Sequence, residues 1–391
     1  MPHEKKYFSS LSNSVKEQGL KVGRNIADWI CNAQSPWAEA SAAPGVIPFS
    51  VDHLNVEIAA PSWNYAYAFM GLAGAYKALG DERYKAVALR LGTVLKSFQI
   101  LDPFHKEHYG AIREMSPLCP WCFTRDAISG GWGLVEMYRF TKEEEYLERA
   151  KLFGQWVLRK GLDEEGYPWF GVQLEPKFYP HTGAHIENDI QGNFQGGGLN
   201  FFYQMYKVTG DKEWCKPMTA IADIFVDHVQ QDSGYFVSIY RATKKPVASS
   251  DAYAMLHRGN DDLGTLGLLG MYDITTNKKY LASVKKFLDA VWAAQRQDGF
   301  FEDSVAASAI ILNATYEARE LVEIEGLTDE KIERAIKAML SAQTIYDHPR
   351  VRGALREQCN SQYSMVTMRA NCYALILLMK LFAGVNEYLC D

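Results

Sequence analysis

Long apolar runs with helical spacing alternate along the chain with short polar turns. One turn motif occurs four times: an aromatic residue, three residues, a turn-forming pair, two residues and a second aromatic residue. The copies are YKALGDERY (76–84), YRFTKEEEY (138–146), YKVTGDKEW (206–214) and YDITTNKKY (272–280). Their first tyrosines, at 76, 138, 206 and 272, are separated by 62, 68 and 66 residues. Because an apolar helical run precedes and follows each copy, each predicts a hairpin of two antiparallel helices.

A second motif marks the opposite end of the hairpins with the same period. The segments EEGYPWF, DSGYFV and QDGFFED each follow the second helix of a hairpin, and their glycines are Gly166, Gly234 and Gly299. These glycines are 68 and 65 residues apart. We expect each glycine to adopt a left-handed turn conformation and the aromatic residue behind it to fold back onto the core.

The complete pattern predicts twelve helices. Single helices are expected near 10–31 and 363–384, and five hairpins between them at 62–98, 127–160, 194–230, 262–295 and 305–343. If the first and last helices pair, six hairpins close into a ring, the all-α (α/α)6 barrel, formed by residues 1–391 as a single domain. An open solenoid of stacked hairpins is the alternative architecture.

On these repeats the chain resembles the six-hairpin (α/α) toroid superfamily of carbohydrate-active enzymes. That superfamily includes polysaccharide lyases, glycoside hydrolases, unsaturated glucuronyl hydrolases and N-acylglucosamine 2-epimerases, and no single one of these families is matched. The resemblance implies that substrate binds in a funnel where the inner helices begin. It places the chemistry in the loops that precede those helices, at 99–127, 163–193, 232–262 and 297–306.

Composition narrows the classes of partner. The chain has 391 residues, of which 48% are hydrophobic, 23% charged and 13% aromatic, and its net charge is -6. The acidic balance and the lack of a Lys/Arg run give no support for nucleic-acid binding. No apolar run reaches membrane-spanning length, so we expect no membrane association. Seven scattered cysteines indicate reduced thiols, and the N-terminus MPHEKKYFSS has no apolar signal-peptide region. We therefore expect a cytoplasmic protein, although a trimmed exported form has the same appearance.

The four long loops are rich in ionisable side chains, whereas the short turns hold routine capping residues. Five of the nine histidines lie in three of these loops, and functional residues concentrate in loops on a rigid scaffold. As catalytic candidates we take His181, His185, Asp189, Tyr253, His257, Asp261 and Asp262. As substrate-binding candidates we take Trp121, Asp126, Glu187, Asn188, Gln191, Asn193, Tyr240, Arg241, Arg258, Asn260 and Glu302.

Other roles compete for the same residues. His181 and His185, with the carboxylates after them, have a spacing that a metal site can use, but Thr182 and Gly183 between them are poor helix formers. We therefore predict no metal and no other cofactor. One polar residue of this loop, and one of the pair Asp261–Asp262, is expected to cap the following helix.

CPWCF (119–123) contains an isolated CxxC. It lacks the partner ligands of a zinc site and the α/β setting of a redox motif, so we interpret Trp121 as a rim aromatic instead. Asp126, at the next helix start, is either a cap or a catalytic carboxylate.

Three reactions suit a toroid. β-Elimination needs a base beside a uronic carboxylate that is neutralised by Asn, Gln or Arg, and the two central loops hold such residues. Inverting hydrolysis needs two separated carboxyl groups, and epimerisation uses two histidines on opposite sides of the sugar. We predict an enzyme that cleaves an anionic, uronic-acid-containing saccharide by β-elimination, as a polysaccharide lyase. A glycoside hydrolase of inverting or unsaturated-glucuronyl type is the first alternative, followed by a sugar epimerase, a terpenoid-type enzyme or a non-catalytic binding scaffold.

Overall fold

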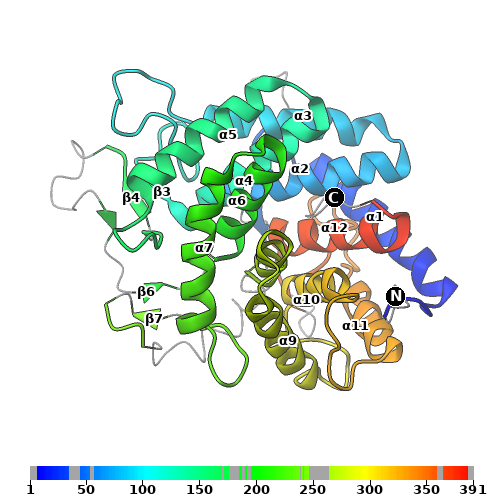
Figure 1. The fold of residues 1–391 in the computed structure, drawn as a ribbon. Helices are drawn as coiled ribbons and strands as arrows, with labels where there is room; N and C mark the ends of the chain where they lie inside the picture. The colour runs from blue at the N-terminus through cyan, green and yellow to red at the C-terminus, as the bar shows by residue number, and fades with distance from the viewer. Residues whose placement is uncertain are drawn as a thin grey trace. The chain divides into compact units, whose positions relative to one another are not determined.

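The computed structural model (Figure 1) describes residues 7–34, 45–52, 57–169, 171–175, 185–186, 190–191, 195–237, 239–240, 242–245, 264–358 and 364–385. The chain divides into two compact units. Unit 1 comprises Met1–Ala60, Tyr67–Leu91 and Val284–Asp391, and unit 2 comprises Pro61–Ala66 and Gly92–Ser283.

Two kinds of helix alternate along the described chain. The core helices are buried on every side, because each contains a run of eight or more consecutive buried residues, which is longer than two helical turns. They are α2 (Ser62–Leu79), α4 (Thr124–Thr141), α6 (Gln195–Thr209), the helix over 264–275, α10 (Val305–Ala318) and α12 (Met368–Ala383). The others bury one face and expose the opposite one: α1 (Asn13–Ala33), α3 (Glu82–Ser97), α5 (Glu144–Trp156), α7 (Cys215–Ile224), α9 (Lys278–Ala293) and α11 (Asp329–Ser341).

The repeated turn has the same backbone geometry in all four copies. At its centre, Gly80, Lys142, Gly210 and Thr276 have φ of 70°, 62°, 69° and 56°. Each donates its N–H to the carbonyl of the first tyrosine of its motif at 2.8 Å. This left-handed cap ends one helix and starts the next. The second aromatic of each motif is buried in the core: Tyr84, Tyr146, Trp214 and Tyr280.

The glycine-aromatic motif also folds as predicted. Gly166, Gly234 and Gly299 have φ of 81°, 93° and 96°. Directly behind Gly166 and Gly299, Tyr167 and Phe300 are buried; behind Gly234, Tyr235 is half-buried and the next residue, Phe236, is buried. Both motifs therefore act as fixed ends of the helical hairpins.

In unit 1 the first helix packs against the last, because α1 contacts α12 and α11, and α10 contacts α12 and α11. The pairing of the first and last helices is thus confirmed. A small sheet of β1 (Pro48–Val51), β2 (Glu57–Ala59) and β8 (Val366–Thr367) has the order β2-β1-β8. It places β1 directly beside the strand that leads into α12.

The segment before α1 is held on α11 by two carboxylates. Asp329 accepts hydrogen bonds from the backbone and side chain of Ser10, and Glu333 accepts from the backbone N–H and hydroxyl of Ser12, both at 2.9 Å. The ion pair with Lys337 at 2.7 Å, together with the Ser12 bonds, lowers the pKa of Glu333 to about 2.

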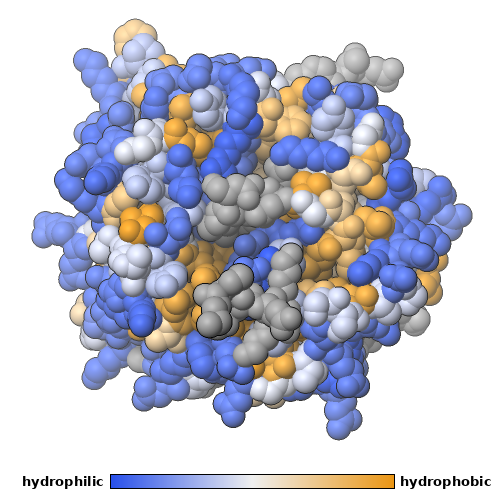
Figure 2. Space-filling view, turned by 45° about the vertical axis from the view of Figure 1, so that its right-hand side comes forward, coloured by the Kyte–Doolittle hydropathy of each residue, from blue (hydrophilic) through white to orange (hydrophobic). Residues whose placement is uncertain are grey.

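In unit 2, α4 packs against α5 and α6, and α6 packs against α7. Close approach requires small residues: a Cβ on Gly133 of α4 would lie 2.5 Å from the Cβ of Ala66 in α2. Short π-helical turns at Val157–Gly161 and Phe225–Val229 extend α5 and α7, and a 3-10 turn at Lys212–Trp214 leads into α7. None of the described helices is long and apolar enough to cross a membrane. Figure 2 shows hydrophilic residues over much of one face.

Candidate functional site

Most of the side chains nominated from the sequence lie outside the described residues. These are His181, Glu187, Asn188, Asp189, Asn193, Arg241, Tyr253, His257, Arg258, Asn260, Asp261 and Asp262. For His185 and Gln191 only the backbone is described. Their roles therefore stay predictions.

The backbone of unit 2 nevertheless joins three of the predicted loops. β3 (Trp121–Phe123), β4 (Gly171–Gln173) and β5 (His185–Ile186) form an antiparallel sheet in which Val172 pairs with both Cys122 and His185. β6 (Ile190–Gln191) pairs with β7 (Ile239–Tyr240). Hence loop 163–193 is hydrogen-bonded to loop 99–127 on one side and to loop 232–262 on the other (Figure 1).

Four nominated side chains are described. Trp121 is half-buried in β3, and Tyr240 is exposed in β7. Asp126 is half-buried in the first turn of α4, whose N-cap residue is Phe123, so Asp126 is not the N-cap. In unit 1, Glu302 is half-buried with φ of 58°, and its carbonyl accepts a hydrogen bond from Arg296 at 3.2 Å.

The CxxC cysteines Cys119 and Cys122 are both free thiols. Burial raises the pKa of Cys122 well above its ordinary value, and the nearby Glu114 carboxylate raises it further. A thiol with a raised pKa stays protonated and is a poor nucleophile or metal ligand. In the described ranges, no group of three or more His, Cys, Asp or Glu side chains is arranged to hold a metal ion.

The sequence analysis missed a set of buried polar side chains on the core helices of unit 2. Ser62 and Asn64 lie in the first turn of α2, Gln204 lies in α6, and Thr265 lies at the start of the helix over 264–275. All four are fully buried. The two hydroxyl groups and both amide atoms of Asn64 and Gln204 have no hydrogen-bond partner among the described residues.

Such groups are costly to a fold. Leaving a buried polar group without a partner costs roughly 1–3 kcal/mol. Buried polar atoms of this kind mark ordered water or a ligand. Amide and hydroxyl groups are neutral and combine donors with acceptors, which suits a ligand rich in hydroxyl groups. The signal in the sequence was an isolated amide within an apolar run: one in SWNYAYAF, and two, Asn200 and Gln204, in LNFFYQMY.

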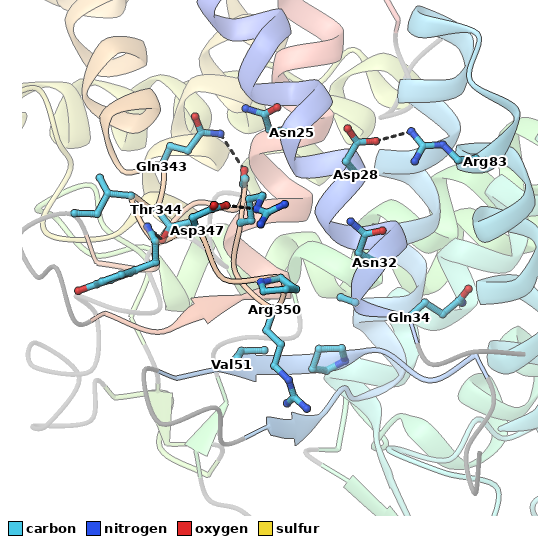
Figure 3. A pocket seen from close by; sticks show the side chains of 17 residues that line it. Asn25, Asp28, Asn32, Gln34, Val51, Arg83, Gln343, Thr344, Asp347 and Arg350 are labelled. Atoms are coloured by element: carbon cyan, nitrogen blue, oxygen red, sulfur yellow. Dashed lines mark hydrogen bonds and ion pairs between the residues drawn. The ribbon is translucent and has the colours of Figure 1, made fainter. Parts of the chain in front are cut away.

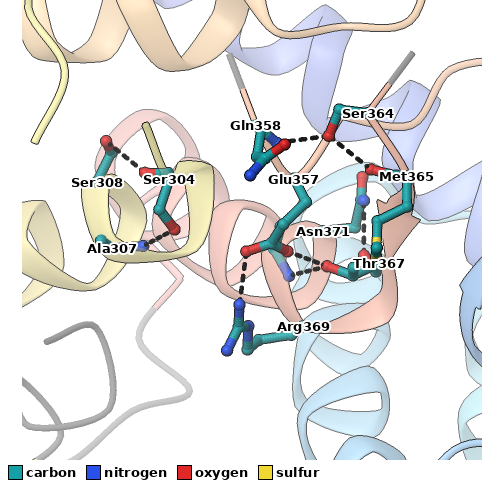
Figure 4. Close-up of polar contacts among 11 residues, drawn as sticks. Ser304, Ala307, Ser308, Glu357, Gln358, Ser364, Met365, Thr367, Arg369 and Asn371 are labelled. Atoms are coloured by element: carbon teal, nitrogen blue, oxygen red, sulfur yellow. Dashed lines mark hydrogen bonds and ion pairs between the residues drawn. The ribbon is translucent and has the colours of Figure 1, made fainter. Parts of the chain in front are cut away.

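Unit 1 has its own polar cluster where α10 and α12 begin (Figure 4). Glu357 is buried and accepts hydrogen bonds from the hydroxyl of Thr367 and from the guanidinium of Arg369, the latter at 2.6 Å. Asn371 holds the preceding segment, because its amide bonds the N–H and the carbonyl of Leu355 at 2.7 and 2.9 Å. The carbonyl of Glu357 also accepts the N–H of Val305, the first residue of α10.

Arg369 retains binding capacity in this cluster. Its Nε is buried and lacks a partner in the part of the chain that the structure describes. Burial lowers the pKa of Arg369, but the adjacent Glu357 carboxylate more than offsets this, so the pKa is raised overall. The guanidinium therefore stays charged and can donate to an oxygen of a ligand. The sequence analysis nominated neither Glu357 nor Arg369.

No family profile matches the sequence, and no curated protein matches it. Solved structures match over nearly the full chain. Cellobiose 2-epimerase from Bacillus thermoamylovorans is 14% identical, with a TM-score of 0.71, covering 94% of this chain and 99% of its own. A sugar epimerase from a ruminal bacterium is 11% identical, with a TM-score of 0.72, covering 95% and 100%. The GH76A α-1,6-mannanase from Salegentibacter sp. is 15% identical, with a TM-score of 0.64, covering 94% and 100%.

These similar structures are (α/α)6 toroids of carbohydrate-active enzymes, and the chain has the (α/α)6 barrel fold that its repeats predict. The resemblance found in the sequence is thereby confirmed at the level of the fold. That residues 1–391 form a single domain stays a prediction.

Proposed function

We propose that the chain is a carbohydrate-active enzyme that binds a neutral saccharide at the polar core-helix positions of unit 2. The observation that carries this proposal is the pair of fully buried amides, Asn64 and Gln204, which lack partners among the described residues. Each amide offers two donor hydrogens and an acceptor oxygen, the kind of group that sugar hydroxyl groups bind. Loops 163–193 and 232–262, which are joined by the pairing of β6 with β7, would supply the reacting groups.

The similar solved structures support a saccharide substrate, because they are α-1,6-mannanases and sugar epimerases. They give no support to the lyase reaction or to a uronic-acid substrate predicted from the sequence. The alternatives, hydrolysis and epimerisation, fit them better. A neutral hexose-containing oligosaccharide also suits the uncharged amides and hydroxyls of unit 2.

We favour hydrolysis of a glycosidic bond. A form of the Salegentibacter mannanase with two consecutive aspartates replaced by alanine is inactive, and its complex contains α-1,6-mannotetrose. The present sequence contains one Asp-Asp pair, Asp261–Asp262, in loop 232–262. Adjacent carboxyl groups raise each other's pKa, so one can act as the general acid while the other stays ionised as the general base.

Epimerisation is the second candidate, favoured by the TM-scores of 0.71 and 0.72 to two sugar epimerases. In that reaction a base removes the proton on the carbon next to the carbonyl of the open-chain sugar, and an acid returns a proton to the opposite face. His185 and His257 would be the base and the acid.

One experiment separates these reactions. The protein is incubated with α-1,6-mannobiose, cellobiose and the corresponding tetrasaccharides in D2O, and proton NMR is recorded over time. Hydrolysis creates new reducing ends, whereas epimerisation leaves their number unchanged and replaces the C2 proton by deuterium. Asp261→Asn or Asp262→Asn should reduce hydrolysis about 100-fold or more, as expected for loss of a general acid or base. His185→Ala and His257→Ala serve as matched variants and should abolish epimerisation instead.

The same protein is also tested on uronic-acid polysaccharides. Formation of an unsaturated uronate, detected by its ultraviolet absorbance, would contradict the proposal and support the lyase reaction predicted from the sequence. Absence of any reaction with both groups of substrates would contradict enzymatic function on these saccharides.

A further inference from the structure

Unit 1 contains a groove remote in sequence from the loops considered above. It lies between α1 and residues 343–353, with β1 along one edge (Figure 3), and its volume is about 780 Å³. This volume lies within the range of small-molecule sites. We call it the side groove.

One wall of the side groove is a polar stripe on α1. Asn25, Asp28 and Asn32 are spaced by three and four residues, so they lie on one helical face (Figure 3). The amides of Asn25 and Asn32 have no hydrogen-bond partner within the described ranges, and each offers donors and an acceptor. The solvent-facing side of a helix usually carries long charged side chains. On this face of α1 the side chains are short amides, which leave the groove open.

Three arginines and two aspartates line the groove, and each aspartate is paired with one of the arginines. Asp28 accepts hydrogen bonds from Arg83 at 2.8 Å and from the Tyr84 hydroxyl at 3.0 Å. Asp347 pairs with Arg352. With both carboxylates paired, neither is left to attract a cationic ligand, and the fixed carboxylate and guanidinium groups still have lone pairs and N–H groups for neutral hydroxyls.

The opposite wall is preformed. Gln343 donates to the carbonyl of Gly353 at 3.0 Å, and the indole of Trp29 donates to the carbonyl of Arg350 at 2.8 Å. Gly353 has φ of 88° and lies so close to α1 that a Cβ would be 2.8 Å from the Asn25 carbonyl. A wall fixed in this way loses little entropy on binding.

An aromatic side chain completes the site. Tyr346 is 43% exposed and lines the groove, next to Ile345, which is 82% exposed. An aromatic ring and directional amides in one groove are the kinds of group that hold the apolar face and the hydroxyl edge of a pyranose ring. We propose that the side groove is a second saccharide-binding site, which holds a neutral oligosaccharide of a few hexose units apart from the reaction site in unit 2.

The proposal is tested by isothermal titration calorimetry with methyl α-1,6-mannotetraoside and methyl β-1,4-cellotetraoside. The Asn64→Leu/Gln204→Met variant removes the proposed binding groups of unit 2, and the Asn25→Ala/Asn32→Ala/Tyr346→Ala variant alters the side groove. We expect the first variant to keep one binding event with one of the two glycosides. We expect the second to weaken that event at least ten-fold while its turnover of the disaccharides stays within two-fold of the wild type.

Three outcomes would overturn the side-groove proposal. The first is that the unit 2 variant binds neither glycoside. The second is that the groove variant binds the glycoside with unchanged affinity. The third is concentration-dependent dimerisation that the groove variant abolishes, because the groove is then a contact between copies of the chain. Tyr346→Ala alone, at an exposed position, provides a second variant if the triple variant folds poorly. Failure of the proposed reaction is seen separately, as absence of turnover in the wild type.

Discussion

Replacing Gln204 by methionine is expected to stabilise the fold and weaken catalysis together. Both atoms of the Gln204 amide are buried and lack partners among the described residues, and methionine has nearly the same length without the polar head. Because an unpartnered buried group costs roughly 1–3 kcal/mol, the free energy of unfolding should rise by about that amount. At about 2.1 cal/mol/K of unfolding entropy per residue over 391 residues, this corresponds to a rise in Tm of about 1–4 °C.

The assay combines calorimetric unfolding with turnover of the preferred disaccharide. Activity should fall at least ten-fold, because substrate hydroxyls lose their partner. Gln230→Met is the matched control: that amide donates to the carbonyls of Gly234 and Ser283 and accepts from the Ser283 hydroxyl. The same replacement there should lower the unfolding free energy by about 1–3 kcal/mol. If Gln204→Met destabilises the protein as Gln230→Met does, Gln204 has a structural partner and is not reserved for substrate.

Three further predictions concern other parts of the fold. Thr276→Gly should raise the free energy of unfolding by about 1 kcal/mol, because a β-branched residue is strained at positive φ. Gly210→Thr, at the matching turn, should lower it. If calorimetry shows the same change in stability for both variants, this reasoning is wrong. Glu357→Gln should cost about 3 kcal/mol by leaving the Arg369 charge poorly compensated, whereas an unchanged unfolding midpoint would show that the pair contributes little. The pKa of Glu333 is lowered from 4.5 to about 2 in the folded state, so its stabilising contribution is present above pH 4.5 and is lost as the pH falls toward 2. The thermal unfolding midpoint of Glu333→Gln should therefore approach that of the wild type as the pH falls toward 2. A constant difference between the two midpoints across the pH range would contradict this.

The helical architecture was accessible from the sequence because its signals are local. The turn motif fixes an aromatic residue at each end of a short segment, and Gly80 or Gly210 at its centre supplies the left-handed conformation that such a turn needs. The predicted ends of the helices therefore lie within a few residues of the ends in the structure. Lys142 and Thr276 adopt the same conformation without being glycine, which shows that the repeat is set by the hairpin and not by one residue type.

The short strands were not predicted. β5 and β6 contain two residues each, which is too short for an alternating pattern to be read. Their partners lie in other loops, so the pairing depends on how the hairpins bring those loops together.

The candidate site was found only in part for a related reason. Polar loops point to a reaction site by composition, but Asn64 and Gln204 are single polar residues within apolar helices. Whether such a residue faces a partner or remains unpaired is decided by packing between helices. Likewise, Glu357 and Arg369 meet only when the segment before α12 folds against its first turn.

The most direct test of the central claim is a crystal structure of the protein soaked with the neutral tetrasaccharide that it turns over best. The account predicts sugar hydroxyl oxygens within about 3 Å of the amide atoms of Asn64 and Gln204. A structure in which both amides bond other protein groups, with the sugar bound elsewhere, would contradict it.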